Sequence, residues 1–217
     1  MSDESRGSGE QQQPVKRTRV RGAERRALML HSAKHVFARS NYAEASTSEL
    51  ARESEVTEPM LYKHFGSKKG LFLAVISEFS AQFLATLQDR ISHRAEQDIR
   101  DALEHIIDDY YAALKVDPET QRILFQAVVE SRDPDVASCV GKHNRKVYDL
   151  IYQLIKRARE EGYVDATISL DAATWGYMSM ILALQYSLML NLPREISGVQ
   201  EEMSQIWLRG LNTHESS

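Results

Sequence analysis

The sequence predicts an all-α protein in which a small three-helix unit precedes a larger helical bundle. Apolar residues recur with helical spacing in nearly every long segment, and no segment alternates as a strand would. Capping residues, Pro and Gly separate these segments. The 217 residues are 42% hydrophobic and 27% charged, which is typical of a globular chain of one or two domains.

The first 20 residues are polar and carry alternating basic residues near their end. They contain no apolar run, so they do not form a secretory signal. Their composition predicts a disordered basic arm. Arg19 and Arg21, at its end, have two interpretations: they contact a polyanion, or they belong to a tail that only keeps the chain soluble.

The first helix is predicted over residues 22–39, where Met29, Ala33, Val36 and Phe37 share one face. It stops at Ser40–Asn41 because Asn, next to Gly, best tolerates the left-handed conformation that ends helices.

Two short helices follow. Ser46 and Glu49 have the spacing of a capping box, and the helix that they open runs to about Ser54. Thr57 is the expected N-cap of the next helix, which tolerates Pro59 in its first turn and ends near Gly66. Ser67 then caps a long amphipathic helix that reaches about residue 92.

The remaining helices are predicted over 97–115, 119–132, 135–161, 171–192 and 196–211, giving about nine in all. Residues 172–192 carry no charge and approach the ~20 residues that a bilayer requires. They include five polar residues and Gly176 and have no basic flank, which favours a helix buried on most faces over a membrane span. We expect three parts: the arm (1–20), a helix-turn-helix unit (21–66) and a regulatory and dimerisation domain (67–213).

Charge is distributed unevenly along the chain. The net charge is −4, yet residues 1–70 hold 13 Lys and Arg against 9 Asp and Glu. Within residues 14–42 the basic residues number eight, against the single acid Glu24. Residues 1–70 thus form a basic front, and the remaining residues form an acidic half. This distribution indicates that a polyanionic partner binds the basic front alone. The single cysteine, Cys139, fits a reducing compartment, and we expect a cytoplasmic protein.

The two short helices suit a helix-turn-helix that binds duplex DNA. The major groove admits one helix, whose first turns meet base edges, while flanking Tyr, Lys and His side chains meet phosphates. The second short helix is rich in these residue types. It contains Tyr62, Lys63 and His64.

A longer pattern surrounds these residues: Phe37, Asn41-Tyr42, Ser46, Leu50-Ala51, Ser54-Glu55-Val56-Thr57, Leu61-Tyr62-Lys63-His64-Phe65, Lys68 and Leu71. Over roughly residues 25–75 this pattern resembles the tetracycline-repressor (TetR) family of bacterial transcription regulators. Two positions depart from the family's pattern, with Asn41 and Glu55 in place of glycines. A Glu with φ above zero costs roughly 1 kcal/mol.

The resemblance implies that Tyr62, His64 and Lys68 hold phosphates, and that other side chains of the second short helix vary with the DNA sequence that is bound. The full set of expected DNA contacts is Arg19, Arg21, Ser46, Thr47, Thr57, Glu58, Pro59, Met60, Tyr62, Lys63, His64 and Lys68. For Glu58, contact with a cytosine amine and a merely favourable charge at a helix N-terminus stay equally open.

The resemblance further implies a dimer whose last two helices form the interface, and a small-molecule effector bound in the acidic half. The scarcity of charge in 172–192 favours an apolar or aromatic effector. Aromatic and apolar side chains at helical spacing are the candidate lining residues, although such stripes are more often core: Tyr110, Tyr111, Phe125, Tyr148, Trp175, Met178 and Tyr186.

Other chemistries have weaker support. The pair His31 and His35, or His105 with Asp108 and Asp109, has helical spacing for a metal, but contact with solvent or phosphate explains the first set better and a solvated face the second. We expect no metal, no cofactor and no catalytic residue, and we interpret Cys139 as a packing residue with redox sensing left open. The alternative function is an all-helical ligand-binding protein or enzyme whose basic front is not a specific DNA reader.

Overall fold

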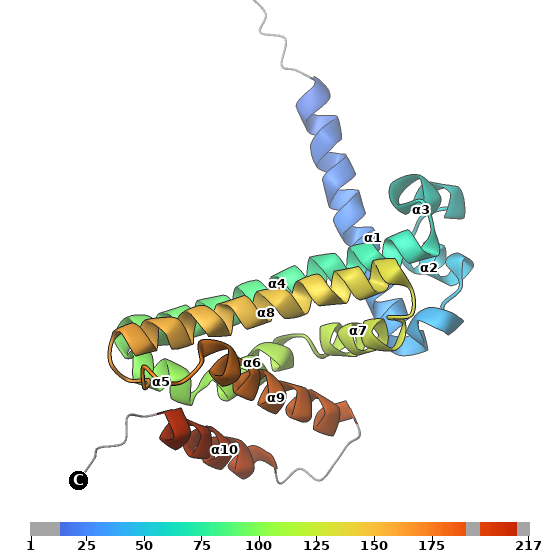
Figure 1. Cartoon of the computed structure of the whole chain (residues 1–217). Helices are drawn as coiled ribbons and strands as arrows, with labels where there is room; N and C mark the ends of the chain where they lie inside the picture. Colours follow the sequence, from blue (N-terminus) through green and yellow to red (C-terminus); the bar gives the residue numbers. More distant parts are fainter. Residues whose placement is uncertain (1–13, 190–195, 212–217) are drawn as a thin grey trace, which may run out of the picture.

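The computed structural model describes residues 14–189 and 196–211, and in these ranges the chain forms ten helices and no strand (Figure 1). The helices are α1 (Pro14–Glu44), α2 (Thr47–Glu53), α3 (Glu58–Phe65), α4 (Lys68–Gln97), α5 (Ile99–Glu104), α6 (Ile106–Val116), α7 (Pro118–Val129), α8 (Pro134–Glu160), α9 (Leu170–Met189) and α10 (Ile196–Leu211). The all-α prediction is confirmed.

Helix α1 is longer at both ends than we predicted. It begins at Pro14, so residues 14–20 are helical rather than part of a disordered arm, while residues 1–13 lie outside the described ranges. Asn41 has a positive φ of 59°, but its ψ of 170° lies outside the left-handed helical region, and helical turns resume to Glu44, so the position is a kink.

The caps around α2 and α3 follow the sequence closely. Ser46 Oγ accepts a hydrogen bond from the amide of Glu49 (3.1 Å), and Ser67 Oγ accepts one from Gly70 (2.9 Å). Thr57 is the N-cap of α3, although its side chain makes no capping bond. Glu55, in the turn between α2 and α3, has a φ of 53°, so this turn has the left-handed geometry that glycine would favour.

The single helix expected over 97–115 is two helices. The break falls at His105, whose φ of −105° and ψ of 13° leave the helical range. Its ring Nδ1 donates to the carbonyl of Asp101 (2.9 Å), a bond that stabilises the end of α5. The spacing of apolar residues continues through the break, which is why periodicity alone did not reveal it.

Two hydrophobic cores hold the helices together, and α4 contributes to both. Its N-terminal half, from Leu71 to Phe79, packs with α1, α2 and α3 and with three apolar residues of α7. Its C-terminal half, from Phe83 onward, packs with α5, α6, α8, α9 and α10. By length and composition alone, α4 is also long and apolar enough to cross a membrane, but its apolar side chains are taken up by these cores.

Helix α7 is tied to α1 by polar contacts as well as by the shared core. The ammonium of Lys34, 5% exposed, lies 2.7 Å from Asp117 and 3.6 Å from Glu119. Burial by itself raises the pKa of Asp117, but hydrogen bonds from Lys34 and Thr120 outweigh it and lower that pKa. Gln126 donates its Nε2 to the carbonyl of Phe37 (2.8 Å). The first helix of the basic front is therefore fastened to a helix of the acidic half.

Helix α9 is buried on one face and exposed on another. Gly176 sits against the indole of Trp207 on α10, where an added Cβ would lie 1.9 Å from the ring, so only glycine permits this approach. The opposite face of α9 exposes Trp175, Leu182 and Tyr186. The buried face and the exposed apolar face together account for the absence of charge in residues 172–189. Residues 190–192 of the uncharged run lie outside the described ranges.

Candidate DNA-binding surface and effector cavity

Helix α3 presents the expected side chains to the exterior of the protein. Leu61 is buried beneath the helix, whereas Thr57, Pro59, Tyr62, Lys63 and His64 are exposed. Glu58 and Met60 are half-buried. Because the hydroxyl of Thr57 makes no capping bond, it is free to contact another molecule. In Figure 1, α3 lies at one end of the molecule, away from α9 and α10.

Helix α2 is fixed beside α3 by its own contacts. Ser46 is exposed and Thr47 half-exposed at its start, with Ser46 engaged in the cap. The carboxylate of Glu49 accepts a hydrogen bond from the guanidinium of Arg39 on α1 (2.8 Å). It therefore does not bond the backbone amide of Ser46, as a complete capping box would require. This ion pair holds α2 against α1, and sequence spacing within α2 could not indicate it.

The lysines at the start of α4 have partners within the protein. Lys68 Nζ donates to the carbonyls of Ala45 (2.8 Å) and Ala43 (3.3 Å), at the end of α1. Two of its three ammonium hydrogens are therefore engaged, although we had assigned this side chain to phosphate. Lys69 bridges to Asp133 (3.0 Å) and Asp135 (2.8 Å) at the start of α8, and these hydrogen bonds raise its pKa.

Arg19 and Arg21 lie on the first turns of α1, in a stretch whose side chains the structure does not describe. Their part in DNA binding stays a prediction. The projection of the α1 N-terminus beyond the rest of the protein, seen in Figure 1, leaves this end of the helix without neighbours from α4 to α8.

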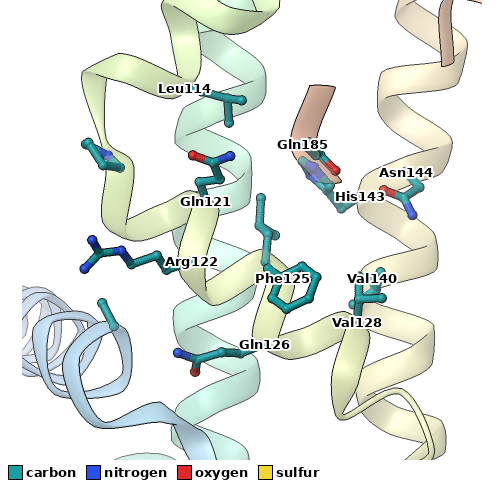
Figure 2. A pocket seen from close by; sticks show the side chains of 13 residues that line it. Leu114, Gln121, Arg122, Phe125, Gln126, Val128, Val140, His143, Asn144 and Gln185 are labelled. Carbon is teal, nitrogen blue, oxygen red and sulfur yellow. The ribbon is translucent and has the colours of Figure 1, made fainter. Parts of the chain in front are cut away.

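A cavity of about 500 Å³ lies in the acidic half, between α7 and its neighbours. Its walls come mainly from α7 and α8, with single residues from α1, α6 and α9 (Figure 2). Figure 2 shows Phe125 of α7 turned toward α8, whereas Arg122 points away from that helix. The residues that line the cavity are Ala38, Leu114, Pro118, Gln121, Arg122, Leu124, Phe125, Gln126, Val128, Val140, His143, Asn144 and Gln185.

Of the seven effector-binding residues expected from the sequence, Phe125 lines this cavity and the other six lie outside it. Tyr110 and Met178 are buried in the core, and the hydroxyl of Tyr110 accepts a hydrogen bond from Gln185. Tyr111 packs under the ammonium of Lys115 (4.2 Å). The remaining three are on the surface of α8 and α9, where Tyr148 donates to Asp171 and faces Trp175: Tyr148, Trp175 and Tyr186.

Two polar residues of the cavity were missed by sequence reasoning. His143 is 6% exposed, and its Nδ1 is buried without a partner among the described residues. Burial, with a smaller contribution from Lys146, lowers the pKa of His143 to about 4, so the ring is neutral near pH 7. Gln126 Oε1 is likewise buried without a described partner. A search for aromatic stripes passes over such residues because an isolated Gln or His has no periodicity.

The side chains considered for metal binding have other contacts. His35 bonds to Glu119 (2.7 Å) and to His31 (3.1 Å). Asp109 is paired with Arg90 and Arg94, and His105 with Asp101. Over the part of the chain that the structure describes, no group of three or more His, Cys, Asp or Glu is arranged to hold a metal. Burial raises the pKa of the Cys139 thiol, which disfavours the reactive thiolate.

Comparison with known proteins agrees with this geometry. Residues 29–75 match the family model described as "Bacterial regulatory proteins, tetR family". The transcriptional activator FasR of Mycolicibacterium smegmatis is 28% identical over 62% of this chain, a match that spans 60% of FasR's own length.

Solved structures share the fold. A regulator assigned to the TetR family from Mesorhizobium loti superposes with a TM-score of 0.78 at 16% identity, over 89% of this chain and 99% of that one. FadR of Bacillus subtilis, solved with stearoyl-CoA, has a TM-score of 0.71 at 12% identity, over 86% and 99%. With the helix-turn-helix of α2 and α3, residues 29–75 of the chain therefore match the N-terminal DNA-binding segment of the TetR family of bacterial transcriptional regulators.

Proposed function

We propose that this protein is a dimeric, ligand-responsive DNA-binding regulator, and that it represses transcription from a palindromic operator until a small effector releases it. The observation that carries the proposal is the exposed array on α3, where no hydrogen bond or ion pair within the described residues engages the side chains of Thr57, Tyr62, Lys63 and His64. In this proposal the protein lowers the transcription of its target genes.

Helix α3 would enter the major groove with Thr57, Glu58, Pro59, Met60 and Lys63 near base edges. Tyr62 and His64 would bind phosphates on either side. Lys68 would contribute through its one remaining ammonium hydrogen, after the two that cap α1. Arg19 and Arg21 would follow the adjacent minor groove or the backbone.

A second copy of the chain would cover the exposed apolar face of α9 and α10. On α9 this face consists of Trp175, Leu182 and Tyr186, and on α10 of Val199, Met203 and Ile206. Contiguous apolar surface of this kind marks an interface, and a two-fold pairing would place two α3 helices for the two halves of a palindrome. A monomer would read only half of the site.

The effector would bind in the cavity beside α7. FadR of Bacillus subtilis, which shares the fold, was solved with stearoyl-CoA, and this supports a small molecule with an apolar body. Because α7 is fastened to α1 through Lys34 and Gln126, a shift of α7 on binding would be passed to the DNA-binding unit. We place the protein in the cytoplasm with its DNA, acting as a regulator and not as an enzyme.

The DNA-binding proposal is tested with a double variant, Tyr62→Phe and Lys63→Ala, and a palindromic fragment from the protein's own promoter region. Affinity should fall at least tenfold, since each lost contact to charged phosphate is worth about 1 kcal/mol or more. If Lys63 binds phosphate, the plot of log affinity against log salt concentration should become shallower by about one unit.

The matched control is Lys156→Ala, which removes an exposed lysine from the end of α8 that is far from α3 in Figure 1. Its affinity for DNA should stay unchanged. The proposal is wrong if the wild-type protein shows no preference for any genomic sequence over bulk DNA at moderate salt.

A further inference from the structure

The cations around α3 differ in whether they are available to DNA. Lys34, Arg39 and Lys69 are in ion pairs with carboxylates. Lys68 donates to two backbone carbonyls. Across the described part of α1, α2 and α3, four exposed cations have no ion-pair partner: Arg25, Arg26, Arg52 and Lys63.

Arg26 differs from the other three because an aromatic ring holds its side chain. The guanidinium carbon lies 5.2 Å from the centre of the Phe65 ring, within the range of a cation–π contact. Such a contact uses the weakly hydrated face of the guanidinium and leaves its N–H groups available in the plane. Arg26 is therefore oriented before it binds an anion, so that binding costs less conformational entropy than for a free side chain.

Phe65 places this guanidinium at the end of α3. It is the last residue of the helix and is half-buried, and its ring lies 6.1 Å from the ring of His64. Figure 1 shows α1 and α3 next to each other, with the first turns of α1 extending past α3. Because the first turns of a recognition helix meet base edges, the end of α3 is nearer to the sugar–phosphate backbone.

The geometry points to Arg26 as a further DNA-binding residue, which binds a backbone phosphate next to the one that His64 contacts. Two parallel N–H groups of the guanidinium hold two phosphate oxygens, a pairing for which arginine is better suited than lysine. Phe65 is its positioning residue. This inference rests on the proposed function, which brings DNA to α3. Sequence reasoning missed Arg26 because the ring that holds it is on another helix.

The test replaces Arg26 by Met, which keeps an unbranched apolar chain over Phe65 and removes the charge. Binding of the full-length protein is measured over a range of salt concentrations with two duplexes of equal length. One is the palindromic promoter fragment and the other has a shuffled sequence. Arg26→Met should weaken binding of both at least about fivefold, because phosphates carry no sequence information. The plot of log affinity against log salt concentration should become shallower by about one unit for each bound subunit.

Three measurements separate a phosphate contact from a structural one. Arg25→Met, which removes the neighbouring exposed cation, should leave the salt dependence unchanged. Arg26→Lys should restore the salt dependence but only part of the affinity, since it keeps the charge and loses the flat fork. The melting temperature of Arg26→Met should stay within about 2 °C of the wild type, as for other exposed positions.

The role of Phe65 is tested by a double-mutant cycle. In the Phe65→Leu background, Arg26→Met should weaken DNA binding less than it does in the wild type, because the guanidinium is no longer held in place. Equal effects in both backgrounds would show that the ring does not position Arg26.

An unchanged salt dependence in Arg26→Met, with both duplexes still bound by the wild type, would overturn the inference and leave the proposed function intact. Equal losses in Arg25→Met and Arg26→Met would overturn it as well, since the effect would then belong to the general charge of α1. If the wild type binds neither duplex, the proposed function is at fault. If it binds both equally and Arg26→Met still changes the salt dependence, the phosphate contact stands and the specific operator does not.

Discussion

Glu55 occupies a backbone conformation that glycine adopts without strain. Its φ of 53° lies in the turn that separates α2 from the recognition helix α3, and a side chain there costs roughly 1 kcal/mol. Glu55→Gly should therefore raise the free energy of unfolding by up to about 0.5 kcal/mol, because the greater freedom of glycine in the unfolded chain offsets part of the strain that is relieved. Urea denaturation would measure it.

The matched control is Glu53→Gly, in the last turn of α2, where the backbone is already helical. It should destabilise the protein by up to about 1 kcal/mol. An equal loss of stability in both variants would contradict the strain that we assign to Glu55.

His143 makes stability depend on pH. Its pKa is about 4 in the folded protein and near 6.5 when unfolded, so between these values the unfolded chain binds the additional proton. The contribution of neutral His143 to the free energy of unfolding is fully present above pH 6.5. It declines as pH falls toward 4, with a slope of at most about 1.4 kcal/mol per pH unit. His143→Gln should remove this part of the decline in melting temperature, whereas His93→Gln, at an exposed position, should not.

Residue identity predicted the local conformations well and the distant partners poorly. The positive φ of Asn41 and the cap at Ser46 follow from what those side chains do to their own backbone. The partners of Lys68 are 23 and 25 residues away, and those of Lys69 are more than 60. Sequence spacing carries no information about such contacts, which is why Lys68 was expected to be available to phosphate.

At the scale of elements, the contact between α1 and α7 depends on a buried ion pair. Lys34 and Asp117 are 83 residues apart in sequence and 2.7 Å apart in space. Removing the carboxylate leaves the ammonium of Lys34 buried without its partner, which costs about 3 kcal/mol, whereas the carboxylate left by loss of the lysine is 32% exposed and keeps part of its hydration. Asp117→Asn should therefore lower stability more than Lys34→Met, measured by chemical denaturation.

Asparagine at position 117 keeps one side-chain oxygen, which can still cap α7 by accepting from the amide of Thr120, while its nitrogen can donate to the hydroxyl of Thr120 that now donates to Oδ2. Glu119, 3.6 Å from the ammonium, will compensate in part. If Lys34→Met proves the more harmful substitution, the ammonium stabilises α1 through the ring of Phe79, 4.4 Å away, more than through the carboxylate.

The order and boundaries of most helices were predictable because capping residues and prolines mark them. Pro118 and Pro134 each stand at the first residue of a helix. The break at His105 was not predictable, since nothing in its neighbourhood is a strong helix breaker. The position of the cavity was equally hidden, because it depends on how α7 and α8 pack and not on either helix alone.

At the scale of the whole molecule, the apolar face of α9 and α10 should hold two copies together. Ile206 is 69% exposed, so a charge at this position should leave the fold of one chain intact. Ile206→Glu should convert the dimer to a monomer in light scattering and lower operator affinity at least tenfold, because the two recognition helices are then no longer joined.

Val129→Glu is the control, since it charges a residue of similar exposure (63%) on α7. It should remain dimeric. Two variants with the same mass as the wild type in solution would place the interface on another face of the molecule.

The packing of Gly176 against Trp207 has an optical consequence. The chain contains two tryptophans, and this contact holds one indole at the junction of α9 and α10 within a single chain. The other, Trp175, directly precedes Gly176 on α9, and 56% of its surface is exposed. Its emission should move to shorter wavelength when a second copy covers it, while that of its neighbour stays constant. The fluorescence of Trp175 should therefore report assembly of the protein, with Trp207 on α10 as the internal reference.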